Sequence, residues 1–149
     1  KALVKMIRNK DYYPIINGTK ITDRKKLIED ILYIGVGNLE RIKEYSILIQ
    51  QKKNDLSINA YNKKREIENK SHKDYIMESY DNPNQLHRLE VRINSDAMKD
   101  FFTREHIEYN PAMFINDDWL WLFFLNFMNR VIRFQSVKGR KVYGVMDLI

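Results

Sequence analysis

The sequence predicts a single α+β domain, residues 1–149, in which helices pack on one face of an antiparallel β-sheet. Segments in which apolar and polar residues alternate, as in strands, occur between segments with helical periodicity. Two strand-like segments, 45–51 and 56–63, are joined by a short polar connection, as in an antiparallel hairpin. No linker, repeat or low-complexity tract divides the 149 residues, so one hydrophobic core is expected.

The N-terminal third is predicted to contain two short helices and a strand. Residues 1–18 are expected to form a short helix and then a loop, because Pro14 and the Asn-Gly pair after it are typical of a break and a turn. Asp23 and the threonine before it can cap a second helix that ends near residue 30. The β-forming residues of 31–37 predict a buried strand that ends at glycines.

The next segment predicts a hairpin. Residues 39–51 could also be drawn as one helix, but "YSILIQQ" and "LSINAYNK" are rich in β-formers and are separated by the polar residues "KKND". Successive side chains of a strand point to opposite faces of its sheet. The core face of the second strand is expected to carry Leu56, Ile58 and Ala60, and its polar face Ser57, Asn59, Tyr61 and Lys63.

The clearest strand is predicted at 86–93, "LHRLEVRI". Its alternation is strict, with His87 and three aliphatic residues on one face. The other face carries Arg88, Glu90 and Arg92, so this strand is expected to present charged groups to solvent.

The remaining elements are mostly helical. A polar, basic stretch at 63–73 is expected to lead into a short helix at 72–80. After the 86–93 strand, Asn94 or the serine that follows it can cap a helix that ends before Pro111. The aromatic-rich segment 116–134 predicts the major core helix, and we interpret its aromatic stripe as a packing surface. A basic turn and a final strand are expected to close the chain.

Composition restricts the possible functions. The chain has 26 Lys and Arg against 20 Asp and Glu, a net charge of +6, which indicates an anionic partner such as nucleic acid. The absence of cysteine excludes disulfides and cysteine nucleophiles and favours a cytoplasmic location. The longest apolar run, 119–128, is too short to cross a membrane. Phosphate-binding glycine loops and serine-hydrolase motifs are absent, which argues against nucleotide hydrolysis.

The two strands together predict a surface on which a phosphodiester could react. If their polar faces align, Tyr61 and Lys63 lie beside the charged residues of 86–93. A tyrosine hydroxyl can attack a phosphodiester when cations stabilise the developing charge, so Tyr61 and Lys63 are the candidate catalytic residues. The same face could equally be a solvated surface with cross-strand ion pairs. Other candidate nucleophiles are Tyr33, Tyr45, Tyr75 and Tyr80.

The charged residues near Tyr61 also suggest ligands for a metal ion and for nucleic acid. The carboxylates of Glu66 and Glu90 could hold a hard divalent cation such as magnesium or manganese, which would polarise a phosphate. The cations nearby could hold the flanking backbone. These nucleic-acid-binding candidates are Lys64, Arg65, Arg88 and Arg92.

The order of the motifs "ILYIG", "INAYNKKREIE" and "LHRLEVRI" resembles that of replication initiation factors of rolling-circle plasmids and filamentous phages. In that family a Tyr-Asn/Asp-Lys strand with a nearby glutamate precedes an Arg-Leu/Phe-Glu strand. The resemblance covers about residues 31–93. It implies an α+β domain, a tyrosine that nicks one DNA strand and a divalent cation held by acidic residues. The paired-histidine metal motif of many such enzymes is absent. The matching positions are Tyr61, Lys63, Glu66, Arg88 and Glu90.

Three functions remain open at this level. The first is a relaxase-like replication initiator, or a large fragment of one, that nicks single-stranded or origin DNA. The second is a non-catalytic, basic nucleic-acid-binding module. The third is a protein-interaction domain whose basic charge serves solubility. Whether the chain is an enzyme is therefore left open.

Overall fold

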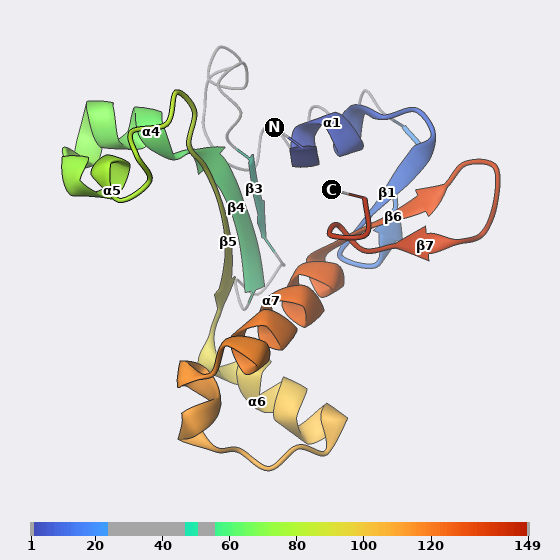
Figure 1. Cartoon of the computed structure of the whole chain (residues 1–149). Coiled ribbons are helices and arrows are strands. Elements are labelled where there is room, and N and C mark those ends of the chain that lie inside the picture. The colour runs from blue at the N-terminus through green and yellow to red at the C-terminus, as the bar shows by residue number, and fades with distance from the viewer. Residues whose placement is uncertain (1, 24–46, 51–55, 149) are drawn as a thin grey trace.

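The computed structural model describes residues 2–23, 47–50 and 56–148, which form a mixed α+β fold (Figure 1). The described strands form two antiparallel sheets, of order β2-β1-β6-β7 and β3-β4-β5, rather than the one sheet that was expected. Helices pack against the strands, so the α+β class is confirmed. The helix predicted to end near residue 30 and the strand predicted at 31–37 lie outside the described residues.

The three-stranded sheet contains the predicted hairpin and the strand that follows it. Its strands are β3 (Ile47–Gln50), β4 (Leu56–Asn62) and β5 (His87–Ile93), with β4 in the centre. Leu56 and Ile58 are buried, and both strands pair antiparallel to β4. The hairpin and the core face of β4 are therefore confirmed.

The four-stranded sheet includes a strand where a loop was predicted. It consists of β1 (Tyr12–Ile16), β2 (Thr19–Lys20), β6 (Ile132–Ser136) and β7 (Val142–Tyr143), and helix α1 (Ala2–Arg8) precedes it. The predicted break at Pro14 was wrong. The carbonyl of Pro14 accepts a hydrogen bond of 2.8 Å from the Ile21 N–H. The backbone of Pro14 therefore faces away from β6. Because an N–H at this position would not bond to β6, a proline here costs the β1–β6 pair no hydrogen bond.

The long helix α7 (Asp117–Val131) is the predicted major core helix, but it is shorter than expected. Its N-cap is Asn116, whose side chain accepts a hydrogen bond of 3.1 Å from the Trp119 N–H. Strand β6 begins at Ile132, directly after the helix. The predicted continuation of the helix through residue 134 was wrong, because Ile132 and Phe134 alternate as buried strand residues.

The remaining helices occur along the chain between β4 and α7. The predicted polar stretch after β4 is itself helical, as α4 (Lys63–Glu66) and the π-helical turn η1 (Ile67–Ser71). The predicted helix at 72–80 is observed as α5 (Asp74–Glu78). Asn94 caps α6 (Ser95–Glu105) as expected, and Pro111 begins a 3-10 helix, η2 (Pro111–Ile115).

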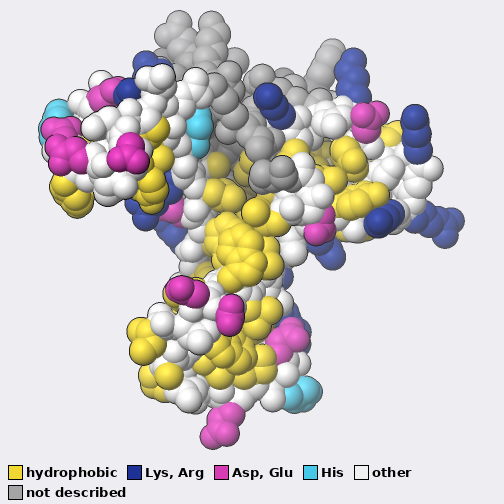
Figure 2. Space-filling model, viewed as in Figure 1, with side chains coloured by type: hydrophobic (Ala, Val, Ile, Leu, Met, Phe, Trp, Pro, Cys, Tyr) yellow, Lys and Arg dark blue, Asp and Glu magenta, His cyan; other side chains and the backbone are white. Residues whose placement is uncertain are grey.

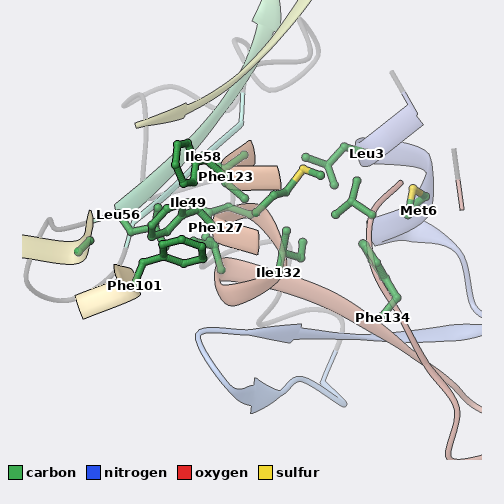
Figure 3. Packing of buried hydrophobic residues seen from close by; sticks show 14 of the residues in the cluster. Leu3, Met6, Ile49, Leu56, Ile58, Phe101, Phe123, Phe127, Ile132 and Phe134 are labelled. Carbon is green, nitrogen blue, oxygen red and sulfur yellow. The ribbon is translucent and has the colours of Figure 1, made fainter. Parts of the chain in front are cut away.

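The buried residues form one continuous cluster, in which α7 packs against both sheets (Figure 3). Phe127 on α7 is fully buried together with Ile58 of the three-stranded sheet and Phe134 of the four-stranded sheet. The two sheets therefore share one core. No helix in the described part of the chain is long and apolar enough to span a membrane.

Candidate functional site

Strand pairing brings Tyr61 and Glu90 to one face of the three-stranded sheet. Tyr61 lies opposite Arg88 in the β4–β5 ladder, and Asn59 lies opposite Glu90. The Tyr61 hydroxyl reaches diagonally across the ladder and donates a hydrogen bond of 3.1 Å to Glu90 Oε1. This face is the one opposite Ile58. The two residues predicted to share a polar surface are therefore in contact, while their functional roles remain predictions.

Glu90 accepts from three donors. Arg88 Nε lies 2.9 Å from its Oε1 atom, and Arg92 Nη2 lies 3.4 Å from its Oε2 atom. The Glu90 side chain is 20% exposed, whereas the side chains of Arg88 and Arg92 are 52% and 68% exposed. Two guanidinium groups thus share one carboxylate and keep much of their surface open to an incoming anion.

Lys63 lies elsewhere than predicted. The strand ends at Asn62, whose side chain accepts a hydrogen bond of 3.2 Å from the Arg65 N–H and so caps α4. Lys63 is the first residue of that helix, is only 8% exposed, and pairs with Glu66 one turn later. The prediction that Lys63 extends the exposed strand face was therefore wrong. Its ammonium nitrogen nevertheless lies 5.9 Å from the centre of the Tyr61 ring.

The surroundings change the acidity of two candidate residues. Burial raises the pKa of the Tyr61 hydroxyl, and so do its hydrogen bond to Glu90 and the negative charge of Glu90. The positive charges of Lys63 and Arg88 act in the opposite direction but do not outweigh these causes. The hydrogen bond from Lys63 is the main cause that lowers the pKa of Glu66. Tyr61 is therefore a neutral phenol at pH 7, and any attack by its oxygen requires a base. Glu90 is the acceptor already in contact with its proton.

Cations outnumber carboxylates around Tyr61. Lys64 lies 4.0 Å from Glu68 on the partly exposed surface of α4, and Arg65 beside it is exposed. The group has a net positive charge, as a phosphate-binding surface requires. Its cations are Lys63, Lys64, Arg65, Arg88 and Arg92, and its carboxylates are Glu66, Glu68 and Glu90.

The residues predicted to bind a metal are engaged with cations. Glu66 pairs with Lys63, and Glu90 pairs with Arg88 and Arg92. The described residues include no group of three or more acidic or histidine side chains that could hold a metal ion. A cation bound by Glu66 or Glu90 would have to displace these partners, so the arrangement does not fit a divalent metal. Magnesium or manganese binding remains a prediction, and we assign no chemical step to it.

Of the other candidate tyrosines, the two that the structure describes are exposed and are not among the residues of the Tyr61 face. Tyr75 and Tyr80 are exposed at α5 and just after it, while Tyr33 and Tyr45 lie outside the described residues. Exposed cations on the four-stranded sheet and its β6–β7 turn were not predicted from the sequence. The one available signal was the run "KGRK" between two β-rich segments.

Comparison with known proteins adds no identification. No family model matches the chain, and no curated protein or solved structure is significantly similar to it. The contacts around Tyr61 are therefore the structural observations that bear on function.

Proposed function

We propose that this chain is the DNA-binding part of a strand-nicking replication initiator in which Tyr61 attacks a phosphodiester. The observation that supports the proposal is the hydrogen bond of 3.1 Å from the Tyr61 hydroxyl to Glu90, with Arg88 2.9 Å from the same carboxylate oxygen. A phenol hydroxyl, a carboxylate that accepts its hydrogen bond and a guanidinium group thus lie together on one sheet face, as the proposed chemistry requires.

The proposed reaction is a transesterification. The Tyr61 oxygen forms a bond to phosphorus while Glu90 accepts the phenol proton. The bond from phosphorus to one ester oxygen breaks, and that oxygen takes up the proton that Glu90 received, so that it becomes a free hydroxyl and Glu90 is again a carboxylate. One DNA end is then linked to Tyr61, and no water or nucleotide is consumed. The guanidinium group of Arg88 would stabilise the charge that develops on the phosphate.

The substrate in this proposal is single-stranded or origin DNA of a plasmid or phage, in the cytoplasm of the host cell. Lys64, Arg65 and Arg92 would contact phosphates on either side of the reacting one, because their side chains are accessible at the border of the Tyr61 face. Lys63, close to the Tyr61 ring, would favour the ionised oxygen in the transition state.

Covalent capture of DNA tests the proposal. The protein is incubated with magnesium or manganese and a labelled pool of random single-stranded DNA, and adducts are resolved by denaturing electrophoresis. We expect an adduct with wild type and with the matched control Tyr75→Phe, whose ring is exposed on α5. Tyr61→Phe should give none. Intact DNA binding by the wild type without any adduct would refute the nicking reaction.

A non-catalytic nucleic-acid-binding module is the second candidate. The raised pKa of Tyr61 and the engagement of Glu66 and Glu90 by cations favour it, because both reduce the readiness of the site for chemistry. In that case Tyr61→Phe keeps the DNA affinity of the wild type, and neither protein forms an adduct. Affinity that falls steeply with salt would distinguish this module from a protein-interaction domain.

A further inference from the structure

The outer face of the four-stranded sheet carries exposed cations. Ile15 lies opposite Lys20 on one side and opposite Arg133 on the other, so these three side chains share a face. Phe134, next to Arg133 in sequence, points to the opposite face and is buried. Lys20 and Arg133 are exposed. The core therefore lies behind this sheet, and its outer face is open.

The turn between β6 and β7 extends this positive surface. The Ser136 N–H donates a bond of 3.1 Å to the Lys141 carbonyl and closes the turn, and Lys138 and Arg140 within the turn are exposed. A Cβ placed on Gly139 would meet no atom within 4 Å, so the turn projects into solvent. Figure 2 shows dark-blue side chains projecting at the edge where Figure 1 places the β6–β7 turn. Lys141 lies over the ring of Tyr143, which is opposite Phe134 in the ladder and so belongs to the other face. We call Lys20, Arg133, Lys138 and Arg140 the basic sheet face.

The basic sheet face differs from the Tyr61 face in how its charges are compensated. None of its four cations forms an ion pair with a carboxylate of the described residues, whereas Lys63, Arg88 and Arg92 all do. One of its lysines lies over a tyrosine ring instead, with Lys20 Nζ 4.6 Å from the centre of Tyr13. A ring orders an ammonium group but does not neutralise it. The electrostatic attraction for an anion is therefore retained.

We infer that the basic sheet face is a second nucleic-acid-binding surface, which holds backbone phosphates apart from the Tyr61 face. The chemistry recognised is the phosphodiester backbone, because the charged groups of this face are lysines and arginines, and Lys20 lies over one face of the Tyr13 ring. Binding here should be independent of sequence and sensitive to salt. This inference does not depend on nicking by Tyr61.

A phospholipid surface is the less suitable partner. Proteins that bind membrane surfaces combine cations with large apolar side chains such as Trp, Phe or Leu that enter the acyl region. The exposed apolar residues at the β6–β7 turn are two valines, Val137 and Val142. The turn thus offers charge with little apolar surface, which matches a nucleic-acid backbone.

The test compares two double variants with the same loss of charge. Lys138→Ala/Arg140→Ala removes two cations of the basic sheet face, and Lys5→Ala/Lys99→Ala removes two exposed lysines on α1 and α6. Affinity for a fluorescent 30-nucleotide DNA of random sequence is measured by anisotropy across a salt series. Loss of two phosphate contacts should reduce the slope of log K against log salt by about 1.4 and weaken binding roughly 10- to 30-fold near 0.1 M salt. The Lys5/Lys99 control should remain within about twofold of wild type.

Three results would overturn the inference. The first is unchanged affinity and slope in the Lys138/Arg140 variant, and the second is an equal loss in both variants, which would reflect net charge alone. The third is a loss of binding to phosphatidylserine vesicles with DNA affinity retained, which would assign the surface to membranes. Thermal unfolding of both variants, followed by circular dichroism, establishes that these exposed substitutions leave the fold intact. Failure of the adduct assay with Tyr61 would not change any of these results.

Discussion

The Tyr61 face and the basic sheet face both present cations on strands, but only the first pairs them with carboxylates. Around Tyr61, Glu90 binds Arg88 and Arg92, which fixes their positions and reduces the net charge. On the other sheet, Arg133 has no carboxylate partner among the described residues. Paired cations place groups accurately for a reaction, whereas unpaired cations contribute attraction. The difference teaches that two basic surfaces of one small protein can differ in how far carboxylates compensate their charge, which is why we propose nicking for the first and backbone binding for the second.

The largest expected effect is on the rate at which Tyr61 forms a covalent adduct with DNA, while the affinity for DNA is retained. Glu90→Gln removes the proton acceptor but keeps the size of the side chain, so the rate of adduct formation should fall about 10²- to 10⁴-fold. DNA affinity should stay equal or increase, because a negative charge is lost. Single-turnover rates at saturating DNA measure the effect, and Glu68→Gln, an exposed carboxylate on η1, is the control. A normal rate in Glu90→Gln would exclude Glu90 as the base.

The second expected effect is on the salt dependence of DNA binding, and it compares an arginine that pairs with a carboxylate with one that does not. Arg133→Ala should lower the salt slope for single-stranded DNA by about 0.7, the value for one phosphate contact. Arg88→Ala should lower it by less, because Arg88 already shares the charge of Glu90. The anisotropy salt series measures both slopes. If Arg88→Ala has the greater effect, the proposed division between the two surfaces is wrong.

The third effect concerns the acidity of Tyr61. Since burial, the hydrogen bond to Glu90 and the charge of Glu90 all raise its pKa, Glu90→Gln should lower that pKa towards the ordinary value near 10. Titration of ¹³C-labelled tyrosine by NMR, with the Tyr61 signal assigned from Tyr61→Phe, measures the shift. An unchanged Tyr61 pKa in Glu90→Gln would mean that burial alone determines it.

The smallest effect is on stability. The pKa of Glu66 is lowered in the folded protein, so its pair with Lys63 stabilises the fold above the usual glutamate pKa, and this contribution is lost as the pH falls through the lowered value. Glu66→Gln should therefore lower the free energy of unfolding at pH 7 by on the order of 1 kcal/mol. Near pH 2 the two proteins should be equally stable. Urea unfolding at both pH values tests this, and an equal difference at both would contradict it.

The three-stranded sheet and its polar face could be predicted because their signal is local. Strict alternation in β5 and the polar connection before β4 determined which side chains share a face, and this led to the proximity of Tyr61 and Glu90. The prediction failed where the chain changes direction. Asn62 ends the strand and caps a helix, which takes Lys63 off the exposed face.

The four-stranded sheet was harder to predict, because its strands are stabilised by partners distant in sequence. Pro14 is tolerated in β1 only because its backbone faces away from β6, and the sequence carries no sign of that orientation. For the same reason the β6–β7 turn was predicted as a turn, but its part in a surface of cations without carboxylate partners was not predicted. Which cations are neutralised depends on the carboxylates that the fold places beside them, as Glu90 shows.

The direct passage from α7 into β6 has a consequence for how the protein can change during evolution. Because Val131 ends the helix and Ile132 begins the strand, the final turn of the helix determines which β6 side chains are buried. One residue inserted at this junction would shift the alternation by one and turn Arg133 towards the core and Phe134 towards solvent. Insertions of a single residue should therefore be selected against at this position.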